Sequence, residues 1–282
     1  MTDWLSYLTA PFGYVFMQRA LLAAVAIGIV CALLSCFIIM KGWTLMGDAI
    51  SHAVLPGIIL AHLAGLPMMA GAFGAGITCA AATGYIKDQC RVKEDTVLGI
   101  VYSGMFALGL VLFSRIDTDQ HLSHILFGNL LGIDRNELLH TLMIIAAVVI
   151  SVLIKRRDLM LYCFDPGQAR ALGLSVARLH YGLLCLLALT IVAALQAVGI
   201  ILVIAMLISP GITAQLLCRR FDWLLLTAVS LSAFSCAAGT LISFYIDGAT
   251  GPCIVLIQAS LFGLAQLAAY TRQRILTLIR NR

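Results

Sequence analysis

Residues 47–57 read GDAISHAVLPG, and they lie inside a segment that is otherwise apolar enough to cross a lipid bilayer. An Asp at the centre of a membrane helix costs roughly 2.5–3.5 kcal/mol on insertion scales, so such a residue normally faces a cavity or an ion path and has a partner. Asp48 and His52 are four residues apart, which makes them neighbours on one helix face. Pro56 cannot donate the hydrogen bond that the His52 carbonyl would otherwise accept. The stretch therefore brings together a carboxylate, an imidazole and a freed carbonyl.

The composition of the whole chain is that of a helical membrane protein. Of its 282 residues, 62% are hydrophobic and 11% are charged, and the mean hydropathy is +1.03. A soluble domain carries about 25% charged residues, and apolar runs of about 20 residues mark bilayer spans. We therefore predict an all-α, polytopic integral membrane protein with a single transmembrane domain over residues 1–282. The first span is expected to serve as the insertion signal, without a cleaved signal peptide.

Eight or nine crossings are predicted, preceded by an interfacial aromatic segment that contains Trp4 and Tyr7. Residues 197–199 are expected to break the chain between the sixth and seventh spans, and residues 209–211 to interrupt the seventh. In the third span, small residues four apart, such as Gly71 and Ala75, allow another helix to approach closely. The expected spans are residues 20–40, 44–63, 67–86, 96–113, 138–154, 179–197, 200–218, 224–245 and 253–270.

Basic residues gather on one side of the nine-span arrangement, and the positive-inside rule assigns that side to the cytoplasm. The net charge of +5 then reflects topology and phospholipid contact, not nucleic-acid binding. The opposite loops carry Asp117, Asp119, His121 and His124, which are first read as a solvated loop and alternatively as an entrance for ions. Asp247 lies in a Gly-rich turn, where a turn role competes with the same entrance role. The cytoplasmic clusters lie within residues 87–93, 155–178, 219–220 and the basic tail at 271–282.

The longest cytoplasmic connection contains the signals of a short helix within residues 164–174. Asp165 is suited to the N-cap, Pro166 to the first helical position, and Gly173 to the end of the helix. A helix of two turns is not stable alone, so its presence in a loop favours docking against another protein, with a plain surface turn as the alternative. No GxxxxGK[ST] phosphate loop occurs in the sequence, so any ATP must be handled by another subunit.

Five stretches together resemble one protein family: residues 41–57, 126–132, 164–174, 194–199 and 247–251. Over essentially its whole length, the chain is similar to the membrane permease subunits of the ATP-binding-cassette importers for zinc, manganese and iron. The form SHAVLPG looks more like the manganese and chelated-iron members than the zinc members, whose equivalent stretch usually lacks the proline.

The resemblance implies a homodimer, or a heterodimer with a related permease, whose pore lies at the subunit interface in the bacterial cytoplasmic (inner) membrane. It also implies two cytoplasmic ATPase subunits and an extracytoplasmic metal-binding protein. Asp48 and His52 match family positions that line the pore as a metal site. The segment with Asp165, Pro166, Arg170 and Gly173 matches the coupling helix that sits in a groove of the ATPase. The chain would then be a transport subunit for Mn²⁺ or Fe²⁺, not an enzyme, and would hold no permanent cofactor.

Several alternatives remain open at this point. Asp48 and His52 could form an intramembrane pair that only holds two helices together, and the cargo could be Zn²⁺, because carboxylate and imidazole ligands suit all three metals. A secondary transporter driven by protons or sodium would also carry intramembrane Asp and His, but it would not need a docking helix. An intramembrane hydrolase would need a water-activating motif such as HExxH, which is absent from the sequence. His140 and His180 have no partner nearby in the sequence and receive no role.

Overall fold

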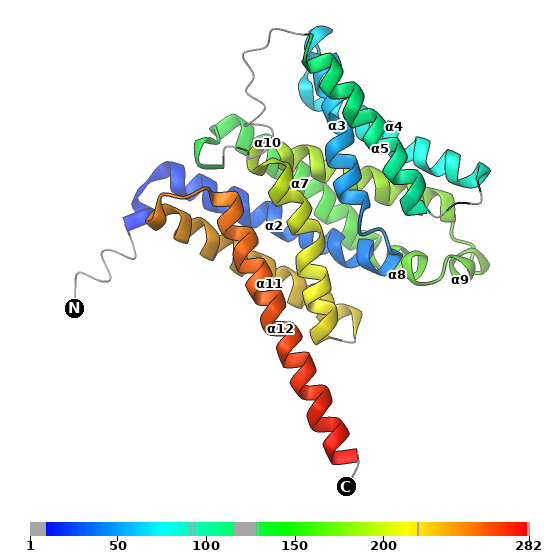
Figure 1. Ribbon diagram of the computed structural model, residues 1–282, viewed down its shortest axis with the longest axis vertical. Helices are drawn as coiled ribbons and strands as arrows, with labels where there is room; N and C mark the ends of the chain where they lie inside the picture. Colours follow the sequence, from blue (N-terminus) through cyan, green and yellow to red (C-terminus); the bar gives the residue numbers. More distant parts are fainter. Residues whose placement is uncertain are drawn as a thin grey trace.

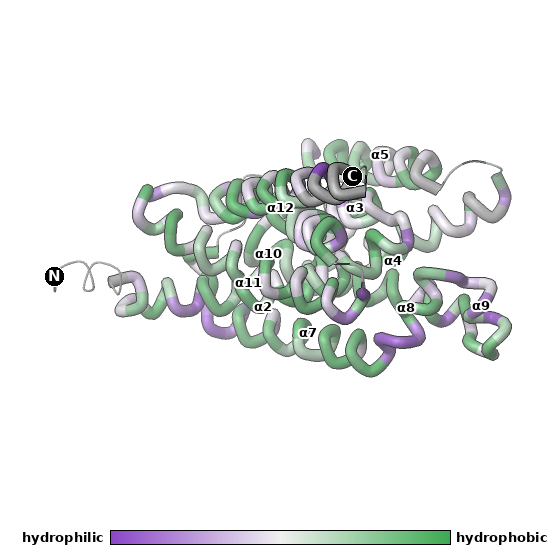
Figure 2. The backbone as a smooth tube through the Cα atoms, turned by 90° about the horizontal axis from the view of Figure 1, so that it is seen from below, coloured by the Kyte–Doolittle hydropathy of each residue, from purple (hydrophilic) through white to green (hydrophobic). Residues whose placement is uncertain are grey.

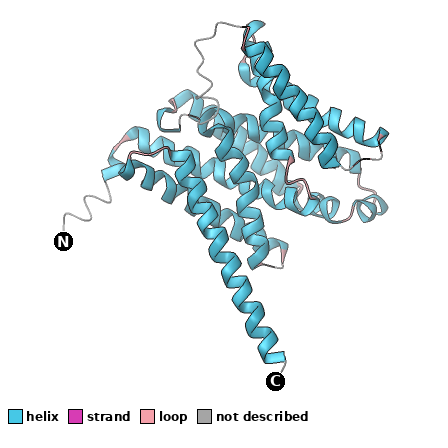
Figure 3. Ribbon diagram, viewed as in Figure 1, coloured by secondary structure: helices cyan, strands magenta, loops and turns pink. Residues whose placement is uncertain are grey.

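The computed structural model describes residues 10–90, 92, 94–115, 128, 130–218 and 220–280 (Figure 1). The described residues form helices joined by short connections, and they contain no strand (Figure 3). The elements in chain order are η1 (Ala10–Gly13), α2 (Val15–Lys41), α3 (Met46–Leu63), α4 (Met68–Gln89), α5 (Glu94–Phe113), η2 (Leu130–Gly132), α7 (Arg135–Ile154), α8 (Arg156–Phe164), α9 (Pro166–Ala171), α10 (Val176–Leu217), α11 (Phe221–Ile246) and α12 (Thr250–Arg280).

Nine spans within the described residues are long and apolar enough to cross a membrane, which agrees with the prediction of eight or nine crossings. Seven of them lie one each in α2, α3, α4, α5, α7, α11 and α12, and the remaining two are the halves of α10, Val176–Leu195 and Ala197–Leu217. Apolar residues dominate these helices, whereas hydrophilic residues gather around α8 and α9 (Figure 2). The hydrophobic runs therefore place the spans, and the polar α8 and α9 lie outside them.

Helix α2 forms the centre of the fold. It packs against α10, α11 and α7, and every residue from Val30 to Ile38 is buried. Because α2 is apolar on all sides, other helices can cover it completely without burying unpaired polar groups, and it occupies the interior position. The first span was correctly predicted as a helix, but this helix begins at Val15, five residues before the predicted start.

Helices α3, α4 and α5 form a second group on one side of α2 and α10 (Figure 1). The predicted close approach of small residues is confirmed where α3 meets α4, because Gly57 and Gly71 bring their backbones into contact there. A Cβ atom added at Gly57 would collide with the Gly71 carbonyl oxygen and would lie 2.5 Å from the Ala75 Cβ. Such small-residue contacts are a main source of helix association in a bilayer, where no hydrophobic effect separates helix from lipid.

Helix α10 contains one of the two expected interruptions. Gly199 has φ 76° and ψ 169°, which breaks the helix between its two membrane spans, as residues 197–199 predicted. The interruption expected at residues 209–211 was wrong, since Pro210 lies inside helical backbone. Ser35 of α2 bonds to the backbone on both sides of the proline: its hydroxyl donates to the Ile208 carbonyl at 3.3 Å and accepts the Gly211 N–H at 3.1 Å. A neighbouring side chain thus satisfies backbone groups beside the proline.

Candidate functional site

Asp48 and His52 form the pair that the four-residue spacing predicted. Asp48 lies in the first turn of α3, where the unpaired backbone N–H groups and the helix dipole favour a carboxylate. Its Oδ1 lies 3.3 Å from His52 Nε2. The side chains are 30% and 27% exposed, respectively, so both can be reached from outside the chain. The pair is therefore a partly open polar spot on an apolar helix.

Two aromatic rings of α5 enclose the imidazole of His52. The Phe106 ring centroid lies 5.0 Å away in an edge contact, and the Tyr102 ring stacks on the imidazole at 6.2 Å. His52 Nδ1 is buried and makes no hydrogen bond to any described residue. Nε2 faces the Asp48 carboxylate, so this side of the ring, and not the enclosed Nδ1, is the side where a metal ion could share both ligands. No spacing in the sequence points to these two rings, because they lie fifty or more positions from His52.

The neighbouring polar group on α3 does not join the pair. The Ser51 hydroxyl donates to the Gly47 carbonyl at 2.7 Å and is buried. Pro56 lies inside α3 and faces α5, where a Cβ atom at Gly109 would come within 3.0 Å of the proline ring. Among the residues described, no group of three or more His, Cys, Asp or Glu side chains could hold a metal ion. The described part of one chain thus offers two protein ligands at this point, Asp48 and His52.

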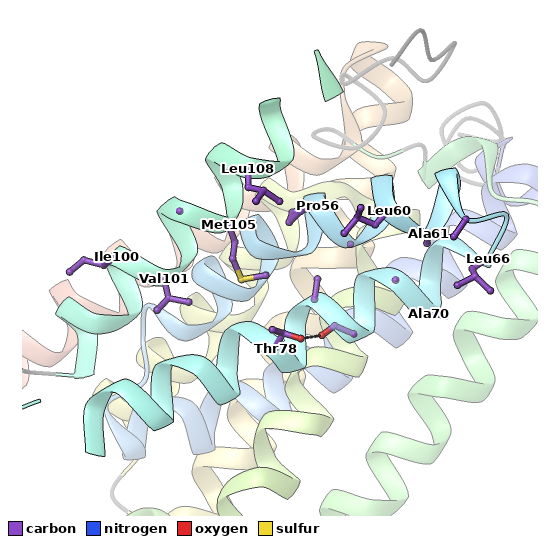
Figure 4. Close-up of a pocket in the computed structure, with 16 residues that line it drawn as sticks. Pro56, Leu60, Ala61, Leu66, Ala70, Thr78, Ile100, Val101, Met105 and Leu108 are labelled. Atoms are coloured by element: carbon purple, nitrogen blue, oxygen red, sulfur yellow. Dashed lines mark hydrogen bonds between the residues drawn. The ribbon is translucent and has the colours of Figure 1, made fainter. Parts of the chain in front are cut away.

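An apolar cavity of about 790 Å³ lies between α3, α4 and α5 (Figure 4). Pro56 and Leu60 of α3 line it from one side, and Met105 and Leu108 of α5 line it from the other. Neither Asp48 nor His52 lines this cavity. The described residues that line it include no ionisable side chain, and this lining is suited to apolar groups.

The short helix expected in the cytoplasmic connection is present as α9. Asp165 is its N-cap, with Oδ1 accepting the backbone N–H groups of Gly167 at 2.8 Å and Gln168 at 3.1 Å. Pro166 is its first residue. Gly173 adopts the left-handed conformation (φ 81°) just after the helix ends, and its N–H donates to the Arg170 carbonyl at 3.0 Å. The predicted start and stop signals are confirmed, while docking of this helix stays a prediction.

The proposed entrance residues are placed only in part. Asp117, Asp119, His121 and His124 lie outside the described residues. Asp247 ends α11 in the left-handed conformation (φ 49°), and the following N–H donates to the Ser243 carbonyl at 3.1 Å. Asp is one of the few residues that adopt this backbone readily, which favours the turn role over the entrance role.

His180 has partners that the sequence did not reveal. Its Nδ1 lies 2.9 Å from the hydroxyl of Tyr162, and its ring makes an edge contact with Trp43 at 5.1 Å between centroids. These residues come from α10, α8 and the connection between α2 and α3. Contacts between such distant segments leave no regular spacing in the sequence, which is why sequence spacing predicts no partner for His180.

Comparisons with known proteins identify relatives that match this chain over most of its length. The chelated iron transport system membrane protein YfeD of Yersinia pestis is 66% identical over 92% of this chain and 88% of that protein. The manganese transport system membrane protein MntB of Synechocystis sp. is 49% identical over 93% of this chain and 86% of that protein. The structure of PsaBC from Streptococcus pneumoniae in complex with Fab has a TM-score of 0.84 at 37% identity, covering 93% of this chain and 95% of that chain.

A family model also matches residues 13–269, which is nearly the whole chain. Its description is the ABC 3 transport family. The match includes all nine spans except the last residues of the ninth, together with α9 and the Asp48–His52 pair. The chain therefore belongs to the ABC 3 transport family.

Proposed function

We propose that this chain is the membrane permease subunit of an ATP-driven importer of divalent transition metal ions, with Mn²⁺ or Fe²⁺ as cargo, in a bacterial cytoplasmic membrane. The observation that carries the proposal is the Asp48–His52 pair, a carboxylate and an imidazole in contact on an apolar membrane-spanning helix. Intramembrane ionisable residues mark ion paths by default, because burying them without a function is costly. The named relatives that transport manganese and chelated iron support this choice of cargo.

The ligand chemistry fits transient binding of such an ion. Carboxylate oxygen and imidazole nitrogen suit Mn²⁺, Fe²⁺ and Zn²⁺, so discrimination among them rests on geometry and ligand number. A conducting path needs binding strong enough for the ion to enter and weak enough for it to leave. Two ligands from each chain meet that requirement when a second permease, identical or related, faces the pair across a pore.

The surface of the α3–α4–α5 group is consistent with such a partner. Only 17% of the span in α5 and 28% of the span in α4 are buried within one chain, against 67% of the span in α3. We place the pore where these helices face a second permease, because the half-exposed Asp48 and His52 would then meet their counterparts. An extracytoplasmic metal-binding protein would deliver the ion to the outer end of this pore.

Helix α9 is proposed to dock on a cytoplasmic ATPase. Two large apolar side chains flank it in exposed positions, Phe164 at 80% and Leu172 at 67% exposure, and Arg170 is exposed between them. Exposed apolar side chains rimmed by polar residues are typical of protein-interaction sites. ATP hydrolysis would then belong to that separate subunit. This arrangement favours an ATP-driven importer over a gradient-driven transporter, which needs no docking helix.

The test is uptake of labelled Mn²⁺ by cells that hold equal membrane amounts of each variant. His52→Ala and Asp48→Ala are expected to abolish uptake, because each removes one of the two ligands. His62→Ala is the matched control, since it changes an exposed histidine at the other end of the same helix. Normal uptake by either Asp48→Ala or His52→Ala would refute the site. Uptake that persists after ATP depletion, with the ion gradient intact, would favour the gradient-driven alternative.

A further inference from the structure

Four side chains, two of them buried, meet in a cluster between α8 and the start of α3. We define the cytoplasmic cluster as Lys41, Trp43, Tyr162 and His180. Trp43 is 3% exposed and Tyr162 is 2% exposed, so both rings are enclosed by protein. The Lys41 ammonium lies 4.3 Å from the centroid of the Tyr162 ring and 6.0 Å from that of Trp43. These distances are those of cation–π contacts, which add to the packing of the two rings.

His180 lies at the centre of this cluster. It is hydrogen bonded to Tyr162 through Nδ1 at 2.9 Å, and its ring packs edge-on against Trp43 with 5.1 Å between centroids. Its Nε2 faces α4, where a Cβ atom at Gly84 would be 4.0 Å away. One imidazole therefore contacts α8 and the connection that precedes α3, and it lies beside α4.

The cluster is tied to α9 on one side. Tyr162 is three residues before Asp165, which both ends α8 and caps α9. Ala169 of α9 is fully buried, and its carbonyl accepts the N–H of Leu174 at 3.0 Å. The two short helices pack on each other, and the Asp165 cap leaves little freedom between them. A displacement of α9 must therefore move the Tyr162 ring.

On its other side, the cluster is connected through the backbone to the Asp48–His52 pair. The Trp43 N–H donates to the Ile38 carbonyl at 2.9 Å, and its own carbonyl accepts the N–H of Met46, the first residue of α3, at 3.1 Å. Asp48 follows two residues later. Closely packed interiors transmit small displacements because they cannot be compressed, so a shift of the Trp43 ring changes the position of the first turn of α3.

We propose that Tyr162 and His180 are positioning residues that convey the movement of α9 to the first turn of α3, and thereby to Asp48. The inference rests on the proposed function, since it takes α9 to be the ATPase-docking helix. The Tyr162–His180 hydrogen bond is the contact that would transmit this movement. It joins α8, which leads into α9, to the His180 ring, which packs on Trp43. Neither residue is one of the two proposed metal ligands, so both would act through α3.

The test compares Tyr162→Phe with Tyr181→Phe in the permease–ATPase complex reconstituted in liposomes. Tyr162→Phe keeps the ring and removes the hydrogen bond, whereas Tyr181 is 56% exposed and touches the same imidazole without that bond. We expect Tyr162→Phe to lower the number of Mn²⁺ ions imported per ATP hydrolysed about five-fold, with ATPase binding unchanged. A change of about five-fold in an equilibrium constant corresponds to the loss of one hydrogen bond. Tyr181→Phe should keep the wild-type ratio. The losses in Tyr162→Phe and His180→Ala should not multiply in the double variant, because both remove the same bond.

A second readout does not depend on the cargo. A fluorescent amino acid at Leu45, which is 47% exposed and immediately precedes α3, should respond to nucleotide in the wild-type complex and not in Tyr162→Phe. If the wild-type complex shows this response but imports no Mn²⁺, the proposed cargo is wrong while the inference stands. A nucleotide response that persists in Tyr162→Phe, or import and hydrolysis that fall together in proportion, would overturn the inference.

Discussion

The contact between Gly57 and Gly71 allows a quantitative test of how α3 is held in place. Gly57→Ala adds one methyl group where the Gly71 carbonyl oxygen already lies, and the same methyl would be 2.5 Å from the Ala75 Cβ. Cβ contacts below 3.0 Å essentially never occur in proteins, and backbone cannot turn away as a side chain can. Helices α3 and α4 must therefore separate.

Separation of the two helices should lower stability measurably. Overpacking of this kind costs about 1–3 kcal/mol, and each kcal/mol lowers the melting temperature of a protein of this size by about 2–4 °C. We therefore expect Gly57→Ala to lower the melting temperature of the purified protein in detergent by about 2–12 °C. Because Gly57 lies five residues beyond His52 on the same helix, Mn²⁺ uptake should fall as well.

The control is Gly74→Ala on the facing helix. No atom lies within 4 Å of a Cβ added there, so this variant tests the change from Gly to Ala without the collision. Alanine favours a helix by up to about 1 kcal/mol over glycine, so Gly74→Ala should be neutral or slightly stabilising. Melting temperatures are to be measured by thermal scanning of both variants in one detergent. Equal melting temperatures for Gly57→Ala and Gly74→Ala would refute the close-contact argument.

Three further predictions concern other parts of the fold. Asp165→Ala removes the cap of α9, at a local cost of about 1 kcal/mol, and should reduce copurification of the ATPase, whereas Asp165→Asn should retain it. Burial raises the pKa of the Cys163 thiol to about 12, so only about one thiol in 10,000 is ionised at pH 8. Because the thiolate is the reactive form, iodoacetamide should label the exposed Cys90 and should not label Cys163 until the protein unfolds. Gln258 is 3% exposed and lines a cavity of about 10 Å³, which has room for one water molecule that bridges its amide to nearby hydroxyls such as that of Ser232. Gln258→Leu should therefore lower the melting temperature, whereas a higher melting temperature would show that the amide is buried without water or a hydrogen-bond partner.

The sequence was sufficient for features that depend on local order. The nine apolar runs predict the nine spans because each run satisfies its own backbone within one helix. The caps at Asp165 and Gly173 and the break at Gly199 are also local, since one residue or its nearest neighbours determine the backbone there. The contact of Asp48 with His52 followed from helix periodicity alone.

The tertiary structure decided what surrounds these local features. Pro210 was expected to interrupt its span, yet Ser35, more than 170 residues earlier, completes the hydrogen bonding beside it. The rings that enclose His52 come from another helix, and the partners of His180 come from two other segments of the chain. Spacing along one helix predicts neighbours on that helix, but it carries no information on which face of another helix will pack against it. That choice depends on the packing of the whole bundle.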